Sequence, residues 1–192
     1  MNEPIIKASE SLIRNGDFER GFTDWKKGLT NPGWLSIAGE IHEGVLIRFL
    51  KAGNKSSVSQ PLRVSKDPGE QARYVLGFWC ETRHTEAGTL KISIDGQQET
   101  LEIPLRPGAS RDVEDDQARL RSGQPLEFKP SKYEVELALP FNAGDTLTVD
   151  VSSPANASND PISGICITRI NLQLHLEQVV MQGLVLDEEP VS

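Results

Sequence analysis

Residues 12–25 read LIRNGDFERGFTDW, and this stretch is the most informative part of the chain. Asn15 and Gly16 both tolerate a positive φ, so together they can reverse the chain in a tight turn. Phe18 and Trp25 follow as two large aromatic residues separated by the mostly polar, glycine-containing residues 19–24. The stretch therefore predicts a turn-containing loop that two aromatic side chains anchor in a hydrophobic core.

Beyond this loop, short runs of alternating apolar and polar residues are separated by turn residues. The strongest run is 73–82, in which Tyr74, Leu76, Phe78 and Cys80 share one face. The other predicted strands are residues 44–50, 56–64, 89–94, 100–103, 133–139, 147–151 and 165–176. Many short strands with turns between them predict an all-β fold, a sandwich or a barrel.

Two segments lack this strand pattern. Residues 104–130 are polar and rich in proline and glycine, which predicts a long, solvated insertion loop with one short helix over 112–121. Residues 178–192 end in acidic residues and predict a loosely held acidic tail. The expected organisation is one β-sandwich domain over residues 1–177, followed by that tail.

Composition restricts the kinds of partner. The 192-residue chain has a net charge of −8 and no cluster of Lys or Arg, so we expect no nucleic-acid partner. No apolar window is long enough to span a membrane. The N-terminus also lacks the pattern of a Sec-type signal peptide, so we expect a chain that is cytoplasmic, exported by another route or cut from a larger protein. The localisation is left open.

The chain has two cysteines, Cys80 and Cys166. They could form a disulfide only if the fold brought their Cα atoms within about 7 Å. A single disulfide is uncommon in a domain of this size, so we predict two buried free thiols.

The sequence offers no convincing catalytic constellation. His42, His84 and His175 are far apart and match no metal-binding spacing, and neither a nucleophile elbow nor a phosphate-binding loop occurs. The acidic run 114–116 is expected in a solvated loop rather than across a cleft. We therefore predict no catalytic residues and no enzymatic activity.

The alternation of the strand over residues 73–82 also predicts a binding surface. If Tyr74 and its alternate neighbours face the core, then Trp79, Glu81 and Arg83 face the other side of the sheet. An indole flanked by charged side chains suits a sugar ring, but Trp79 could also simply pack beneath the 104–130 insertion. Trp34 follows a predicted turn, where it is either a ligand platform or a plug at the end of the sandwich. Other residues expected on the face of Trp79 are Lys91, Ser93, Asp95, Glu134 and Glu136.

The N-G-D-F-E…G…W pattern of residues 15–25 resembles the N-terminal signature of galactose-binding-like jelly rolls, which include carbohydrate-binding modules of the xylan- and glucan-binding type. Residues 58–62 and 74–79 are similar to two strands of that family, and the resemblance extends over about residues 10–176. It implies a jelly-roll β-sandwich of two antiparallel sheets and a non-catalytic, lectin-like role in carbohydrate binding.

The resemblance also implies a structural calcium ion, which family members often hold with the acidic residue that ends the motif, here Glu19, and an aspartate in the closing strand. This chain has Thr168 and Arg169 in that strand. A hydroxyl is a poor substitute for a carboxylate at a calcium site, and we expect Arg169 to pair with Glu19 or Asp17 instead. The resemblance thus implies Glu19 as a calcium ligand, whereas Thr168 and Arg169 argue against the ion, and no other cofactor is expected.

Together these observations predict a protein that binds a glycan through Trp79, Glu81 and Arg83, with Trp34 contributing from a loop. The alternative is a protein-interaction module that assembles into a larger surface or particle structure. The insertion and the acidic tail favour that alternative, because a minimal sugar-binding domain needs neither.

Overall fold

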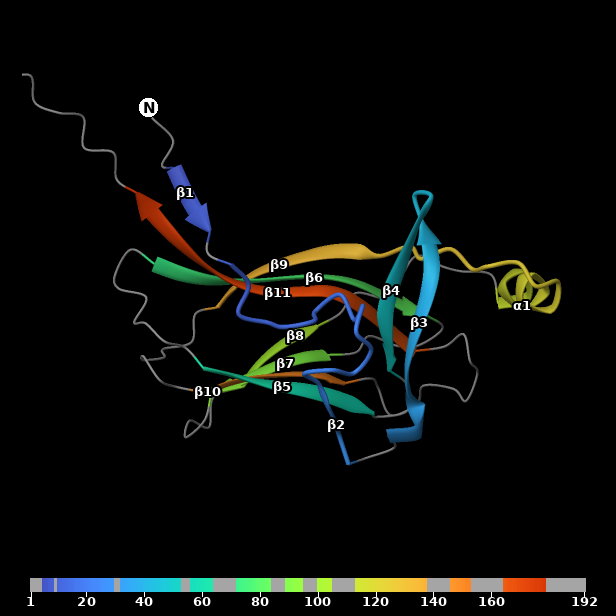
Figure 1. Ribbon diagram of the computed structural model, residues 1–192, viewed down its shortest axis with the longest axis horizontal. Helices are drawn as coiled ribbons and strands as arrows, with labels where there is room; N and C mark the ends of the chain where they lie inside the picture. The colour runs from blue at the N-terminus through green and yellow to red at the C-terminus, as the bar shows by residue number, and fades with distance from the viewer. Residues whose placement is uncertain are drawn as a thin grey trace, which may run out of the picture.

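A computed structural model describes residues 5–8, 10–29, 32–52, 56–63, 72–83, 89–94, 100–104, 113–137, 146–152 and 164–178. Within these ranges the chain forms two antiparallel sheets that lie over one another as two layers (Figure 1). Sheet A has the order β3-β4-β11-β6-β9, with β1 paired to β11, and sheet B has the order β2-β5-β10-β7-β8. The predicted all-β jelly-roll sandwich is confirmed.

Sheet A consists of β1 (Ile5–Ala8), β3 (Leu35–His42), β4 (Val45–Ala52), β6 (Ala72–Arg83), β9 (Ser131–Leu137) and β11 (Gly164–Gln178). Sheet B consists of β2 (Lys26–Lys27), β5 (Ser57–Arg63), β7 (Thr89–Ile94), β8 (Thr100–Pro104) and β10 (Thr146–Ser152). The described helices are η1 (Pro32–Trp34), which is a 3-10 turn, and α1 (Val113–Arg121).

Every predicted strand is present, but some strands pair with neighbours other than those expected from the sequence. The neighbours of β6 are β11 and β9, whereas β7 belongs to sheet B. The expectation that Lys91 and Ser93 share the face of Trp79 is therefore wrong, because the chain crosses from sheet A to sheet B between β6 and β7. Asp95 lies outside the described residues. Glu134 and Glu136 do lie on β9 beside β6, as expected.

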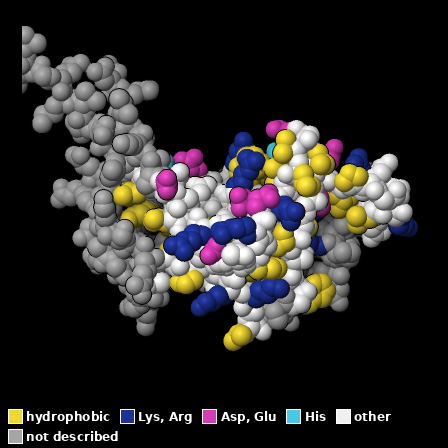
Figure 2. Space-filling model, in the orientation of Figure 1, with side chains coloured by type: hydrophobic (Ala, Val, Ile, Leu, Met, Phe, Trp, Pro, Cys, Tyr) yellow, Lys and Arg dark blue, Asp and Glu magenta, His cyan; other side chains and the backbone are white. Residues whose placement is uncertain are grey.

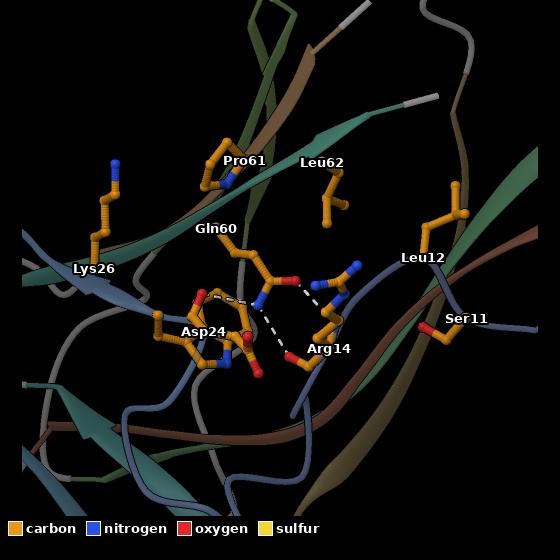
Figure 3. Close-up of a pocket in the computed structure, with 9 residues that line it drawn as sticks. Ser11, Leu12, Arg14, Asp24, Lys26, Gln60, Pro61 and Leu62 are labelled. Atoms are coloured by element: carbon orange, nitrogen blue, oxygen red, sulfur yellow. Dashed lines mark hydrogen bonds between the residues drawn. The ribbon is translucent and has the colours of Figure 1, made fainter. Parts of the chain in front are cut away.

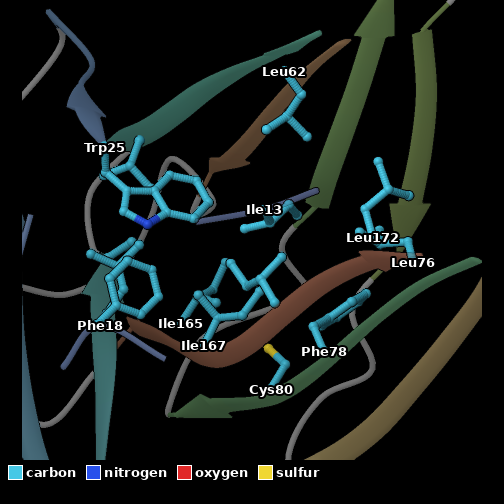
Figure 4. Close-up of a cluster of buried hydrophobic side chains, with 14 of the residues drawn as sticks. Ile13, Phe18, Trp25, Leu62, Leu76, Phe78, Cys80, Ile165, Ile167 and Leu172 are labelled. Carbon is cyan, nitrogen blue, oxygen red and sulfur yellow. The ribbon is translucent and has the colours of Figure 1, made fainter. Parts of the chain in front are cut away.

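The main core lies between the two sheets (Figure 4). The predicted inward face of β6 is confirmed, since Tyr74, Leu76, Phe78 and Cys80 are all buried in this cluster. The remaining buried members are Ile13, Phe18, Trp25, Leu35, Leu50, Ala52, Val58, Leu62, Leu137, Ile165, Ile167, Ile170 and Leu172.

The loop over residues 10–25 contacts both layers (Figure 1), since Leu12 donates to Leu172 on β11 and Arg14 donates to Gln60 on β5. Asn15 adopts a φ of 49°, and its side-chain amide donates to the carbonyls of Gly21 and Thr23 at 2.9 and 2.8 Å. Its own carbonyl accepts a hydrogen bond from the indole nitrogen of Trp25 at 3.0 Å. That indole stacks on Phe18 with 5.3 Å between ring centroids. Both aromatic residues anchor the loop in the core, as predicted.

The predicted helix of the insertion is confirmed as α1, but the prediction that the whole insertion is solvated is wrong. Leu126 and Phe128, which follow α1, are buried. The backbone nitrogen of Phe128 donates to the carbonyl of Ile41 on β3 at 2.9 Å. Its ring stacks on Phe49 at 4.8 Å, and together with Ile47 and Cys166 these residues form a second hydrophobic cluster. We call residues 126–128 the covering segment, because it shields part of the outer face of sheet A.

Cys80 and Cys166 are both buried and free, as predicted. Cys80 faces the main core, whereas Cys166 belongs to the second cluster on the outer face of sheet A. The two thiols therefore point to opposite sides of the same sheet.

In the described part of the chain, no helix is both long enough and apolar enough to cross a membrane. The predicted acidic tail lies outside the described residues, except for Gln178 at the end of β11.

Candidate functional site

Trp79 lies half-buried on the outer face of sheet A, and cations cover it. The guanidinium carbon of Arg169 lies 3.9 Å from the centroid of the indole ring, and the ammonium of Lys132 lies 4.8 Å from it. The imidazole of His42 meets the same indole edge-on at 5.3 Å. In this arrangement, Trp79 is a platform for two cations rather than an open aromatic surface.

A β-bulge in β11 places Arg169 over this indole. Thr168 pairs with Trp79 and Asn171 pairs with Gly77, so two residues of β11 stand opposite Phe78 alone. Arg169 adopts a φ of 53°, and the side-chain amide of Asn171 donates to its carbonyl at 3.0 Å. The extra residue turns Arg169 to the outer face while Ile170 remains in the core.

Beside this stack is a hollow of about 420 Å³, which we call the outer hollow. The residues around it come from three adjacent strands, β6, β9 and β11. Those on the outer face are Val75, Gly77 and Trp79, then Lys132 and Glu134, and finally Arg169, Asn171, Gln173 and His175. Gly77 leaves space at its floor, because a Cβ there would lie 2.9 Å from the amide nitrogen of Asn171.

The charged groups of the outer hollow are unevenly paired. Glu136, next to the hollow, is held by Arg73 at 3.0 Å. Among the described residues, neither Arg169 nor Lys132 has a carboxylate within ion-pair distance. Nε2 of His175 is buried and has no hydrogen-bond partner in the described structure. The hollow therefore brings together a half-buried aromatic ring and three polar groups, those of Arg169, Lys132 and His175 Nε2. None of these three groups has an ion-pair or hydrogen-bond partner among the described residues.

Glu81 and Arg83 were expected to stand exposed beside Trp79, and the structure contradicts that exposure. Each is only 2% exposed. The Arg83 guanidinium donates to Glu40 at 2.8 Å and, through Nε, to Glu81 at 3.1 Å. Glu81 also accepts a hydrogen bond from the backbone nitrogen of Lys129 at 3.1 Å. Lys129 directly follows the covering segment, so its bond to Glu81 helps to hold that segment against the sheet.

Trp34 lies half-buried in η1, at the start of β3, and is not among the residues that line the outer hollow. The structure thus does not bring Trp34 together with Trp79 around this hollow.

The region where the resemblance implies calcium is built differently. The carboxylate of Glu19 pairs with Arg48 at 3.4 Å, rather than with Arg169 as expected. Thr168 donates its hydroxyl to the carbonyl of Arg48 at 2.6 Å. Calcium prefers six to eight oxygen ligands, and the described residues contain no cluster of three acidic, His or Cys side chains. Glu19 as a metal ligand stays a prediction.

A second hollow, of about 740 Å³, lies beside the N-terminal loop (Figure 3). Gln60 stands at its centre, but its amide is already engaged: it accepts from the nitrogen of Arg14 at 2.8 Å and donates to the carbonyls of Arg14 and Asp24 at 2.9 and 3.2 Å. The indole nitrogen of Trp25, which also lines this hollow, is bonded to Asn15. These groups already hold the loop to sheet B through their hydrogen bonds, which leaves them less available to a ligand. The outer hollow is therefore the better candidate site.

Sequence reasoning located Trp79 but missed Arg169, Lys132 and Asn171 as its neighbours. Glu134 was expected on this face, and Lys132 could have been found by extending the alternation of 133–139 by one residue. Arg169 could not, because regular alternation would place it on the core face.

No protein family matches the sequence, and no curated protein matches it either. Among solved structures, the enzymatically active domain of tailspike protein 4 from bacteriophage CBA120 superposes with a TM-score of 0.54 at 15% identity. That match covers 85% of this chain but only 21% of the tailspike chain, so this chain spans about a fifth of its length. At this identity the likeness supports the fold.

Two carbohydrate-binding modules are also similar. A family 61 module in complex with β-1,4-galactotriose gives a TM-score of 0.48 at 13% identity, covering 88% of this chain and 100% of that one. The tandem family 22 modules of a Paenibacillus barcinonensis protein give 0.46 at 12% identity, covering 88% and 50%.

Proposed function

We propose that the protein binds a glycan in the outer hollow and catalyses no reaction there. The observation that carries this proposal is that the guanidinium of Arg169, the ammonium of Lys132 and Nε2 of His175, which line the hollow with the half-buried indole of Trp79, have no ion-pair or hydrogen-bond partner among the described residues. Binding sites for small polar ligands typically combine an apolar or aromatic wall with a few well-placed hydrogen-bonding groups. The resemblance of residues 15–25 to the signature of sugar-binding jelly rolls supports a glycan as the ligand.

Each group has a role in this proposal. The guanidinium of Arg169 and the ammonium of Lys132 donate hydrogen bonds to sugar hydroxyls, and the carboxylate of Glu134 accepts them. Trp79 keeps Arg169 in place and offers apolar surface beside it. Because Glu81 and Arg83 are buried, we assign them an indirect part, which is to keep the covering segment packed next to Trp79.

The experiment is affinity electrophoresis through gels that contain different plant and bacterial polysaccharides, with the folded state of each variant checked by circular dichroism. Replacing Trp79 by Ala is expected to weaken retention about tenfold or more, because both the ring and the platform for Arg169 are lost.

Trp34→Ala is the matched control, since it removes the same side chain at a position away from the outer hollow. Retention that depends on Trp34 and not on Trp79 would move the site to the loop at η1. Failure of every polysaccharide to retain the wild-type protein would end the proposal.

A second candidate function is assembly with another protein. Val45 and Leu46, at the tip of the β3–β4 hairpin, are 60% and 56% exposed. Hydrophobic side chains gather over that hairpin in Figure 2. Size-exclusion chromatography with light scattering tests this candidate, because a stable oligomer that dissociates in a Leu46→Ser variant would support it.

A further inference from the structure

The proposed function does not specify the charge of the ligand, and the two cations of the outer hollow, Arg169 and Lys132, bear on that charge. The whole protein has a net charge of −8, so Lys and Arg residues have many acidic side chains available as partners. Arg169 and Lys132 nevertheless have no ion-pair partner among the described residues, although both contact the same indole.

Arg169 is also held in place before any ligand arrives. Its backbone is fixed in the bulge by the hydrogen bond from Asn171, and its guanidinium lies on the ring of Trp79 at 3.9 Å. A stacked guanidinium keeps its in-plane N–H donors available, and two parallel donors match the two oxygens of a carboxylate.

The other charged groups nearby do not cancel this arrangement. Among the described residues that line the hollow, Glu134 is the one carboxylate, against the two cations. Glu136 is engaged by Arg73 at 3.0 Å. His175 adds a buried Nε2 without a described partner, which can donate or accept a hydrogen bond.

From this geometry we infer that the glycan is acidic, and that Arg169 binds the carboxylate of a uronic acid unit in the outer hollow with Lys132 close by. This inference rests on the proposed function, because it specifies the chemical class of the ligand at the same site. Trp79 is then a positioning residue for Arg169 as well as part of the wall.

The experiment compares paired polysaccharides in affinity gels and by calorimetry: polygalacturonate against its methyl ester, glucuronoxylan against arabinoxylan, and alginate against β-1,4-galactan. Methyl esterification caps the carboxylate and leaves the polymer backbone intact. We expect at least one acidic polymer to be retained, and its neutral counterpart to be retained about tenfold less.

Arg169→Gln is expected to weaken binding to the acidic polymer about tenfold or more and to leave the melting temperature nearly unchanged, since the side chain is exposed. Arg119→Gln on α1 is the matched control, because it removes the same charge from an exposed arginine away from the hollow. Equal losses in the two variants would mean that only net charge matters, and would overturn the inference.

The outcomes separate the inference from the proposed function. Retention by neutral polymers alone, lost in Trp79→Ala, would keep glycan binding and overturn the acidic ligand. Retention by no polymer of either kind would remove both.

Discussion

Gly16 is required by a close approach between two backbones. Its nitrogen and carbonyl belong to a loop, and that carbonyl accepts a hydrogen bond from the nitrogen of Ile170 in the bulge of β11 at 3.1 Å. A Cβ at position 16 would overlap the carbonyl oxygen of Ile170. Because that oxygen belongs to a central strand, the backbone cannot easily move away.

Gly16→Ala is therefore expected to destabilise the protein by about 2 kcal/mol or more, as overpacking against a fixed backbone does. Chemical denaturation followed by tryptophan fluorescence measures the free energy of unfolding. Gly33→Ala is the control, because a Cβ at Gly33 meets no atom within 4 Å and should change stability by less than about 0.5 kcal/mol. Equal stability of the two variants would contradict this contact.

At the scale of elements, the covering segment packs the end of the insertion onto the outer face of sheet A. Phe128 is only 1% exposed and stacks on Phe49. Phe128→Ala should destabilise the protein by about 3–5 kcal/mol, because it leaves a cavity over the second cluster.

Leu120→Ala is a matched comparison, since Leu120 is 46% exposed on α1 and its truncation should cost less than about 0.5 kcal/mol. Hydrogen exchange adds an independent readout: the amide of Phe128, bonded to Ile41, should lose protection in Phe128→Ala only. Unchanged protection would show that the segment is held by something other than this ring.

The elements differ in how well the sequence predicts them. The sequence predicts both strand β6 and which of its side chains face the core, because apolar residues recur at every second position from Tyr74 to Cys80. Strand β3 was missed, since Gly39 and Glu40 interrupt its apolar pattern. The buried contacts of Glu81 and Arg83 could not be predicted, because their partners Glu40 and Lys129 are far from them in sequence.

The candidate site around Trp79 could also be predicted only in part from the sequence. Alternation places Trp79 on the outer face, but the position of Arg169 depends on a single extra residue in β11. A bulge has no clear signature in one sequence, and one residue of register reverses the face of every side chain beyond it.

At the scale of the whole molecule, the two thiols report on global unfolding, because they lie on β6 and β11, the adjacent inner strands of sheet A. Burial raises the pKa of Cys166 to about 12, from an ordinary value near 9, and raises the pKa of Cys80 well above its usual range. The thiolate is the reactive form, so both thiols should be inert in the folded protein at mildly alkaline pH.

A thiol-specific disulfide reagent is thus expected to modify neither cysteine in native buffer and both in concentrated guanidinium chloride. The pH dependence has a definite sign: between the unfolded and folded pKa values the folded state keeps protons that the unfolded state releases, so the free energy of unfolding falls as pH rises above about 9. Rapid modification of either thiol in native buffer would contradict the described burial.

The placement of β11 also determines when this molecule can finish folding. It is the last described strand, yet it lies between β4 and β6, pairs with β1, and accepts the N-terminal loop through bonds such as that of Leu172 to Ser11, 161 residues apart in sequence. Contacts of such separation form slowly, because a long loop must close first. During synthesis, β4 and β6 leave the ribosome before β11, so the strand edges that pair with β11 stay unpaired until nearly the whole described chain has emerged. Until then these exposed edges are open to chaperones or to misassembly.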